Sequence, residues 1–229
     1  MKLKNAGFSA AVMLTIFVPA TSHAQGVFDL GSLTNTLTVN AGTTQNSAKA
    51  PALSLDTLDF QSSPQLSKDN IAKFIAGLKQ ASPDVGTQLE QGLSNVDLFA
   101  EMDKELAKYG LRTTNMGDAM VIYWVASWMA ANGRTEEPTR AQIDGTRQML
   151  AGALGSAPGI SNLSDAEKQS TSQAMLLQFF LNEIMLGGLQ SEPAALKKVR
   201  ADIKLATKEV GGLDIDQFDM TANGLARKK

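Results

Sequence analysis

The chain has 229 residues, 43% of them hydrophobic, and a formal net charge of −2. This length predicts one domain with appendages, and the weak acidity argues against nucleic acid and anionic membrane surfaces, which require clustered basic charge. The chain has no cysteine, and its single histidine, His23, lies near the N-terminus. Beyond His23 the sequence excludes Ser-His-Asp catalysis, thiol chemistry and metal sites with His or Cys ligands, so we expect no metal and no cofactor.

Residues 1–24 have the features of a secretory signal peptide. Lys2 and Lys4 precede the apolar run "FSAAVMLTIFVPA", which is too short to span a bilayer, and "SHA" places small residues before a cleavage point after Ala24. A retained N-terminal anchor is the alternative. Cleavage predicts a mature chain that starts at Gln25, has 19 basic and 23 acidic residues, keeps no membrane span, and is periplasmic or secreted.

Residues 25–66 are predicted to be a flexible, low-complexity linker. The stretch "GSLTNTLTVNAGTTQNSAKAPALS" is rich in small and polar residues and has few large apolar side chains. Such a composition buries too little surface to offset the entropy of ordering. Leu55, Leu58 and Phe60 are the residues in it that can dock locally, before "QSSPQLS" interrupts the chain again.

From Ser67 the spacing of apolar residues becomes helical. Ser67 is expected to cap a first helix, and Ser82 with Pro83 to begin a second. Gly110 supplies a left-handed residue at the end of a third. The apolar positions that define these three helices are Ile71, Phe74, Ile75 and Leu78; Val85, Leu89 and Leu93; and Val96, Phe99, Met102, Leu106 and Tyr109.

The stretch "DAMVIYWVASWMAANG", residues 118–133, is predicted to be the central helix. Asn115 can cap it, Asp118 lies in its first turn, and Gly133 ends it. Its apolar part covers about 20 Å, which is shorter than a hydrocarbon core of about 30 Å. A short helix that is apolar on all sides, in a chain of amphipathic helices, belongs inside a bundle.

Three further helices complete the prediction. One runs from near Pro138 to about Leu154, the next begins at a capping box of Ser164 and Glu167, and the last begins at Pro193. No convincing β alternation is present. The sequence therefore predicts an all-α fold, a compact bundle of about seven helices, with a single domain over residues 67–225 and a solvated basic tail over 226–229.

Few residues point to a chemical activity. The acidic stretch "LDIDQFD" resembles the start of a calcium loop, but the glycine and the final glutamate that such a loop requires are absent, which indicates an acidic turn. Glu183, within "FFLNEIML", and Asp118 are the candidate catalytic carboxylates, because burial raises the pKa of such groups and a glycosidase needs only two acids. Gln178 and Asn182 offer a simpler interpretation, in which Glu183 belongs to a narrow polar seam.

Aromatic side chains of the central helix are candidate ligand contacts. Tyr123, Trp124 and Trp128 could stack on a sugar or a cation. A tryptophan pair four residues apart in a continuous apolar helix is more often part of a core. We therefore expect packing, and we keep a ligand site as the alternative.

The segment "NMGDAMVIYWVASWMAANG" resembles an uncharacterised family of exported bacterial proteins, known only as a domain of unknown function. The matching residues are Asn115, Asp118, Ala119, Tyr123, Trp124, Trp128, Asn132 and Gly133. The flanks "NIAKFIAGLKQASPD", "YGLRTTN" and "GLDIDQF" also agree, so the resemblance covers about residues 65–225. It implies a single exported domain and supplies no catalytic residues.

These observations favour a binding or interaction module in the bacterial periplasm, whose partner is an envelope protein or a small ligand. The alternative is a carboxylate-dependent enzyme that cleaves cell-wall glycan, with Glu183 as its general acid. Whether Glu183 and Asp118 share a cleft distinguishes the two, and the sequence leaves this open.

Overall fold

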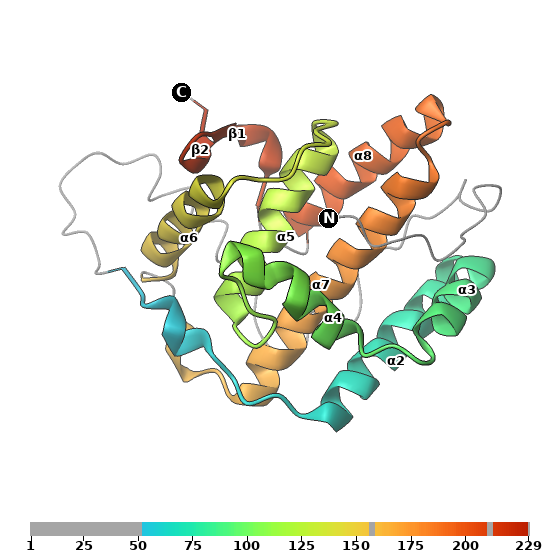
Figure 1. Cartoon of the computed structure of the whole chain (residues 1–229), viewed down its shortest axis with the longest axis horizontal. Helices are drawn as coiled ribbons and strands as arrows, with labels where there is room; N and C mark the ends of the chain where they lie inside the picture. Colours follow the sequence, from blue (N-terminus) through green and yellow to red (C-terminus); the bar gives the residue numbers. More distant parts are fainter. Residues whose placement is uncertain (1–51, 156–158, 210–212, 229) are drawn as a thin grey trace.

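The computed structural model describes residues 52–155, 159–209 and 213–228, and the predicted signal peptide lies outside these ranges. The described residues form seven α-helices and one two-stranded sheet (Figure 1). The helices are α2 (Pro64–Ala81), α3 (Pro83–Leu93), α4 (Leu98–Leu106), α5 (Met116–Ala131), α6 (Arg140–Leu154), α7 (Asp165–Gly188) and α8 (Pro193–Glu209). The all-α prediction is confirmed. Among these helices, none is long and apolar enough to cross a membrane.

Helix α5 is the centre of the bundle. It packs against α6, α7 and α8, which lie around it in Figure 1. The side chains of Tyr123 and Trp124 are fully buried, whereas Trp128 is only partly buried. Burying an indole of roughly 150–250 Å² contributes about 4–6 kcal/mol at ~25 cal/mol per Å². The prediction of a buried central aromatic helix is therefore confirmed.

Helices α2 and α7 are joined by a row of polar side chains. Helix α2 begins at Pro64 because Ser63 accepts a hydrogen bond from the Leu66 N–H and proline is pre-organised for a first helical position. Ser67, predicted to be this cap, lies one turn inside the helix. Its hydroxyl instead accepts hydrogen bonds from the amides of Gln169 and Gln173 on α7, at 2.9 and 2.7 Å.

The predicted linker over residues 25–66 is wrong in its C-terminal part, while residues 25–51 lie outside the described ranges. A 3₁₀ helix, η2 (Leu55–Leu58), precedes α2, and Leu58 is fully buried. Lys168 of α7 donates to the carbonyls of Thr57 and Asp59, at 2.9 and 3.1 Å. Because its partners come from distant helices, this segment is ordered despite its polar composition, and the domain begins before Ser67.

The predicted basic tail over residues 226–229 overlaps a hairpin, and its described residues 226–228 are exposed. Strand β1 (Phe218–Thr221) pairs in antiparallel register with β2 (Gly224–Arg227), so the hairpin includes Arg227. Gly224 adopts a φ of +94°, which the tight turn requires and side chains disfavour. The Leu225 N–H donates to the Thr146 hydroxyl, which holds the hairpin against α6.

The acidic stretch forms a turn that is tied to α8. It contains a 3₁₀ helix, η5 (Ile215–Gln217), in front of the hairpin. Lys208 donates to Asp214 at 2.9 Å and Lys204 to Asp216 at 2.6 Å. These ion pairs connect the end of the chain to α8.

Candidate functional site

The first turn of α5 is held by Asn115. Its side-chain oxygen accepts the Asp118 N–H at 2.9 Å, as predicted for the N-cap. Its side-chain amide donates to the Leu55 carbonyl at 2.7 Å and to Asp59. One buried side chain thus caps the helix and attaches η2 to it.

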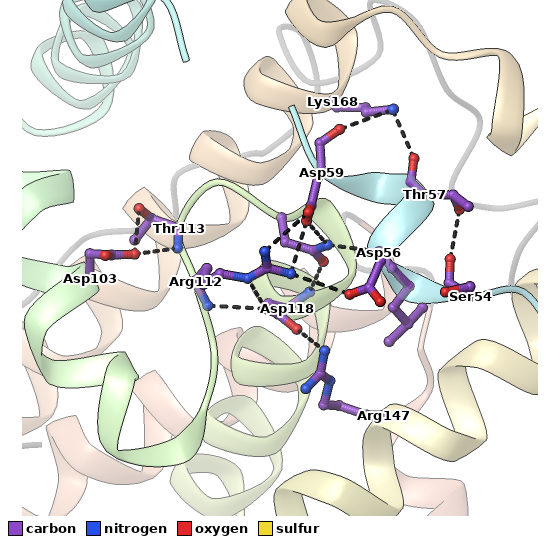
Figure 2. Close-up of polar contacts among 12 residues, drawn as sticks. Ser54, Asp56, Thr57, Asp59, Asp103, Arg112, Thr113, Asp118, Arg147 and Lys168 are labelled. Atoms are coloured by element: carbon purple, nitrogen blue, oxygen red, sulfur yellow. Dashed lines mark hydrogen bonds and ion pairs between the residues drawn. The ribbon is translucent and has the colours of Figure 1, made fainter. Parts of the chain in front are cut away.

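Asp118 lies inside the same cluster, drawn in Figure 2. Its side chain is fully buried and accepts the Arg112 N–H at 3.0 Å, and Arg147 of α6 lies 2.9 Å from its other oxygen. Burial raises the pKa of Asp118, although Arg147 and the Arg112 N–H oppose the shift. Arg112 in turn binds Asp59 through two nitrogens, at 2.9 and 3.0 Å.

This cluster connects η2, the α4–α5 loop, α5 and α6. Lys168 adds α7 through its bonds to the η2 carbonyls (Figure 2). Nearly every polar group in this cluster has a partner within the cluster, so its bonds hold the connected elements together. We call this cluster the clasp. Asp118 is enclosed by basic and amide groups and does not line the cavity described next.

A cavity of about 630 Å³ lies between α5, α7, α8 and the loop of residues 133–138. A volume of this size suits a small-molecule ligand. Most of its wall is apolar, and its polar residues come chiefly from the loop, α7 and α8. The apolar lining includes Leu106, Ile122, Ala126, Met129, Phe179 and Leu196.

Arg200 of α8 lines this cavity and lies against Gly133. A Cβ on Gly133 would lie 3.1 to 3.2 Å from three atoms of the Arg200 guanidinium, so the group lies face-on against the glycine. Gly133 has a φ of +68° and ends α5. The Nε of Arg200 is buried, and within the described ranges the side chain makes no hydrogen bond or ion pair.

Glu183 of α7 lines the same cavity. It is partly buried, and it also lacks a hydrogen bond or ion pair to any residue that the structure describes. Burial raises the pKa of its carboxyl group. Gln178 donates to Asn182 at 3.0 Å, so the predicted polar seam exists without Glu183 as a hydrogen-bonded member.

The remaining charges of the cavity are paired. On the loop, Arg134 binds Glu136, and Glu137 accepts from Lys108 at 2.9 Å and from the Tyr109 hydroxyl at 3.0 Å. The unbalanced groups are therefore Arg200 and Glu183.

The candidate residues from the sequence lie in different places. Glu183 faces the cavity, and Asp118 belongs to the clasp, so this cavity does not bring the two together. Tyr123 and Trp124 are in the core, where burial raises the pKa of Tyr123 to about 12. Trp128 donates its indole N–H to the Phe218 carbonyl at 2.8 Å. These contacts make the three rings packing and anchoring groups.

Arg200 was not singled out by the sequence. It lies in "KKVRADIK", where it looks like one more solvated cation of an amphipathic helix. Gly133 was predicted to end the central helix, but its sequence context did not indicate that a guanidinium lies against the glycine. In the described part of the chain, no group of three or more His, Cys, Asp or Glu residues is placed to hold a metal ion.

Comparison with known proteins gives one match. The model of a family of unknown function (DUF6683) matches residues 13–228. The chain belongs to this family. A search of curated proteins and a search of solved structures each found no match. The family match covers most of the chain and assigns no activity to the cavity.

Proposed function

We propose that this protein is an exported binding module of the bacterial envelope, periplasmic or secreted, that holds a small molecule in the cavity between α5, α7 and α8. One observation carries the proposal: two charged side chains without a partner in the described chain, Arg200 and Glu183, line a single largely apolar cavity. A buried donor without an acceptor costs about 1–3 kcal/mol. A buried group without a partner in a native structure calls for an explanation, and a bound ligand supplies one for a group that lines a cavity.

Export is supported by residues 1–24, whose basic start, apolar run and small residues match a cleaved signal. Fractionation of the producing cells and N-terminal sequencing test it. Recovery outside the cytoplasm with Gln25 as the first residue is the expected result. Recovery of an uncleaved chain in the membrane fraction contradicts it.

Ligand binding is tested with small-molecule extracts of the bacterial envelope. We expect the extracts to raise the melting temperature of the wild-type protein, and native mass spectrometry to show the added mass. Gly187→Phe is the blocking variant, because Gly187 lines the cavity on α7 and a Cβ there meets open space. Gly77→Phe on α2 is the matched control, since Gly77 also has open space but does not line the cavity. Equal shifts in both variants contradict the proposal.

The alternative function is cleavage of cell-wall glycan with Glu183 as the general acid. Its support is the raised pKa of Glu183 in an accessible cavity. Glu136 and Glu137 also line the cavity, but each is engaged by a cation. Release of soluble fragments from purified peptidoglycan by the wild type, lost in Glu183→Gln, would replace the binding proposal with this one.

A further inference from the structure

Arg200 lines the cavity with a positive charge that no described residue pairs with an opposite charge. A guanidinium stays protonated at any physiological pH, so Arg200 cannot remove its own charge. Because one face of the group rests on Gly133, its N–H groups point along the plane and away from the glycine. A fork of donors held in this way matches a carboxylate, which accepts two parallel hydrogen bonds.

Glu183 differs from Arg200 because it can become neutral by binding a proton. The charged groups that line the cavity with it are Arg200 from α8 and, from the loop, Arg134, Glu136 and Glu137. The loop residues are already paired. A protonated Glu183 does not repel an anion and can donate a hydrogen bond to it. Among the described lining residues, Arg200 is the group that must keep an unpaired charge, and this charge favours an anionic ligand.

The size and lining of the cavity add a second requirement. A small inorganic anion would occupy only the surroundings of Arg200 and leave the partly buried apolar side chains of Ala126, Ile184 and Leu196 uncovered. An apolar body would cover these side chains and gain from burial.

We infer that the cavity binds a small amphipathic carboxylate, whose head is held by Arg200 and whose apolar part packs on α5 and α7. This inference rests on the proposed binding function and names its ligand class.

The test measures binding of three probes with the same ten-carbon chain to the full-length purified protein, by calorimetry below their micelle-forming concentrations. The probes are decanoate, decanesulfonate and decyltrimethylammonium. We expect both anions to bind about 10-fold or more tightly than the cation. Decanesulfonate is ionised at every pH used, so its binding shows whether the order of the three affinities depends on ligand charge rather than on protonation of the ligand.

Substitutions of individual cations test whether Arg200 supplies the positive charge that holds the ligand head. Arg200→Gln should weaken decanoate binding about 10-fold or more. Lys198→Gln, which removes a cation of α8 that is paired with Asp202 and does not line the cavity, should change it less than about 3-fold. Circular dichroism checks that both variants fold. Arg200→Lys, which keeps the charge but loses the planar fork, should give intermediate binding and serves if the Gln variant does not fold.

The outcomes separate the ligand class from the binding function. Preference for the cation, or equal binding by Arg200→Gln and wild type, overturns the amphipathic carboxylate. If the probes do not bind but envelope extracts still stabilise the wild type and not Gly187→Phe, the ligand class is wrong and the binding function stands. If neither probes nor extracts bind, both proposals fail.

Discussion

Asn115→Ala tests whether the clasp at the start of α5 stabilises the fold. The substitution removes the cap of α5, which is worth about 1 kcal/mol. It also removes the donor to the Leu55 carbonyl and to Asp59, inside a site where Asn115 is 0% exposed. Leaving such acceptors without a partner costs about 1–3 kcal/mol. The expected loss is therefore about 3 kcal/mol.

Two other substitutions separate these contributions. Asn115→Ser keeps a capping oxygen but loses the amide donor, so we expect a loss of about 2 kcal/mol. Thr139→Ala removes an N-cap of α6 that is exposed and has no second role, so we expect about 1 kcal/mol.

Urea denaturation followed by tryptophan fluorescence and circular dichroism measures these differences. In a domain of this size, 3 kcal/mol lowers the melting temperature by about 6–12 °C. Amide hydrogen exchange should accelerate in residues 55–60 for Asn115→Ala and stay unchanged there for Thr139→Ala. Equal losses in the two alanine variants, with no change in exchange at η2, would refute the bridging role of the Asn115 amide.

Further predictions address pH and close packing. Burial raises the pKa of Glu183 above its ordinary value of 4.5. The contribution of this group to the free energy of unfolding is therefore fully present below pH 4.5, and it is lost as the pH rises through the pKa of the folded state. Glu183→Gln should therefore match the wild type near about pH 4 and exceed its stability at about pH 8 in denaturation curves, and an equal pH dependence of the two would contradict the burial of the carboxyl group. Burial also raises the pKa of Tyr123 from 10.0 to about 12. The stability linked to this phenol therefore declines above pH 10.0. Ultraviolet absorbance should show the phenol ionising near pH 12 or together with unfolding. A Cβ at Gly145 would lie 1.6 Å from the Asn223 carbonyl oxygen, so Gly145→Ala should cost more than about 2 kcal/mol and loosen the hairpin. Gly152→Ala, where a Cβ meets nothing within 4 Å, should be neutral or stabilise α6 by about 0.5–1 kcal/mol, and similar effects at the two glycines would argue against the close contact.

Local signals were enough to predict the helices. The capping box of Ser164 and Glu167, the cap at Asn115 and the proline at residue 193 each act within one turn of the chain, and all three are found at helix starts. The apolar content of α5 predicted its central place because no other arrangement hides an apolar surface on every side.

The errors occur where the partners of a segment are distant in sequence. Residues 52–63 have a linker-like composition, and their order comes from Lys168 and Asn115, more than 50 residues away. Ser67 would serve as a cap by local rules, but Gln169 and Gln173 use its hydroxyl. The short strands of the hairpin are held by Thr146, and four residues are too few for an alternating pattern to be recognised.

The candidate site shows the same limit. Glu183 was found because an ionisable residue in an apolar run is unusual, whereas Arg200 sits in a helix with several lysines. Its special position comes from the backbone of Gly133, which lies on another helix end. Such a contact joins two separate local patterns and is not visible in either one.

The two ends of α5 differ in how their polar neighbours are satisfied, and this difference separates stability from binding. At its N-terminal end, Asn115 and Asp118 are surrounded by partners, so changes there should lower stability. At its C-terminal end, the Arg200 guanidinium lies against Gly133 and has no hydrogen-bond or ion-pair partner in the described chain. A buried donor without an acceptor costs free energy, and a ligand that accepts its hydrogen bond removes this cost. Asn115→Ala should therefore reduce stability while the folded fraction still binds decanoate, and Arg200→Gln should lose binding without losing stability, because it removes a buried donor that has no acceptor. A single set of variants thus tests the division of α5 into a structural end and a ligand-facing end, since joint loss of both properties in either variant would contradict it.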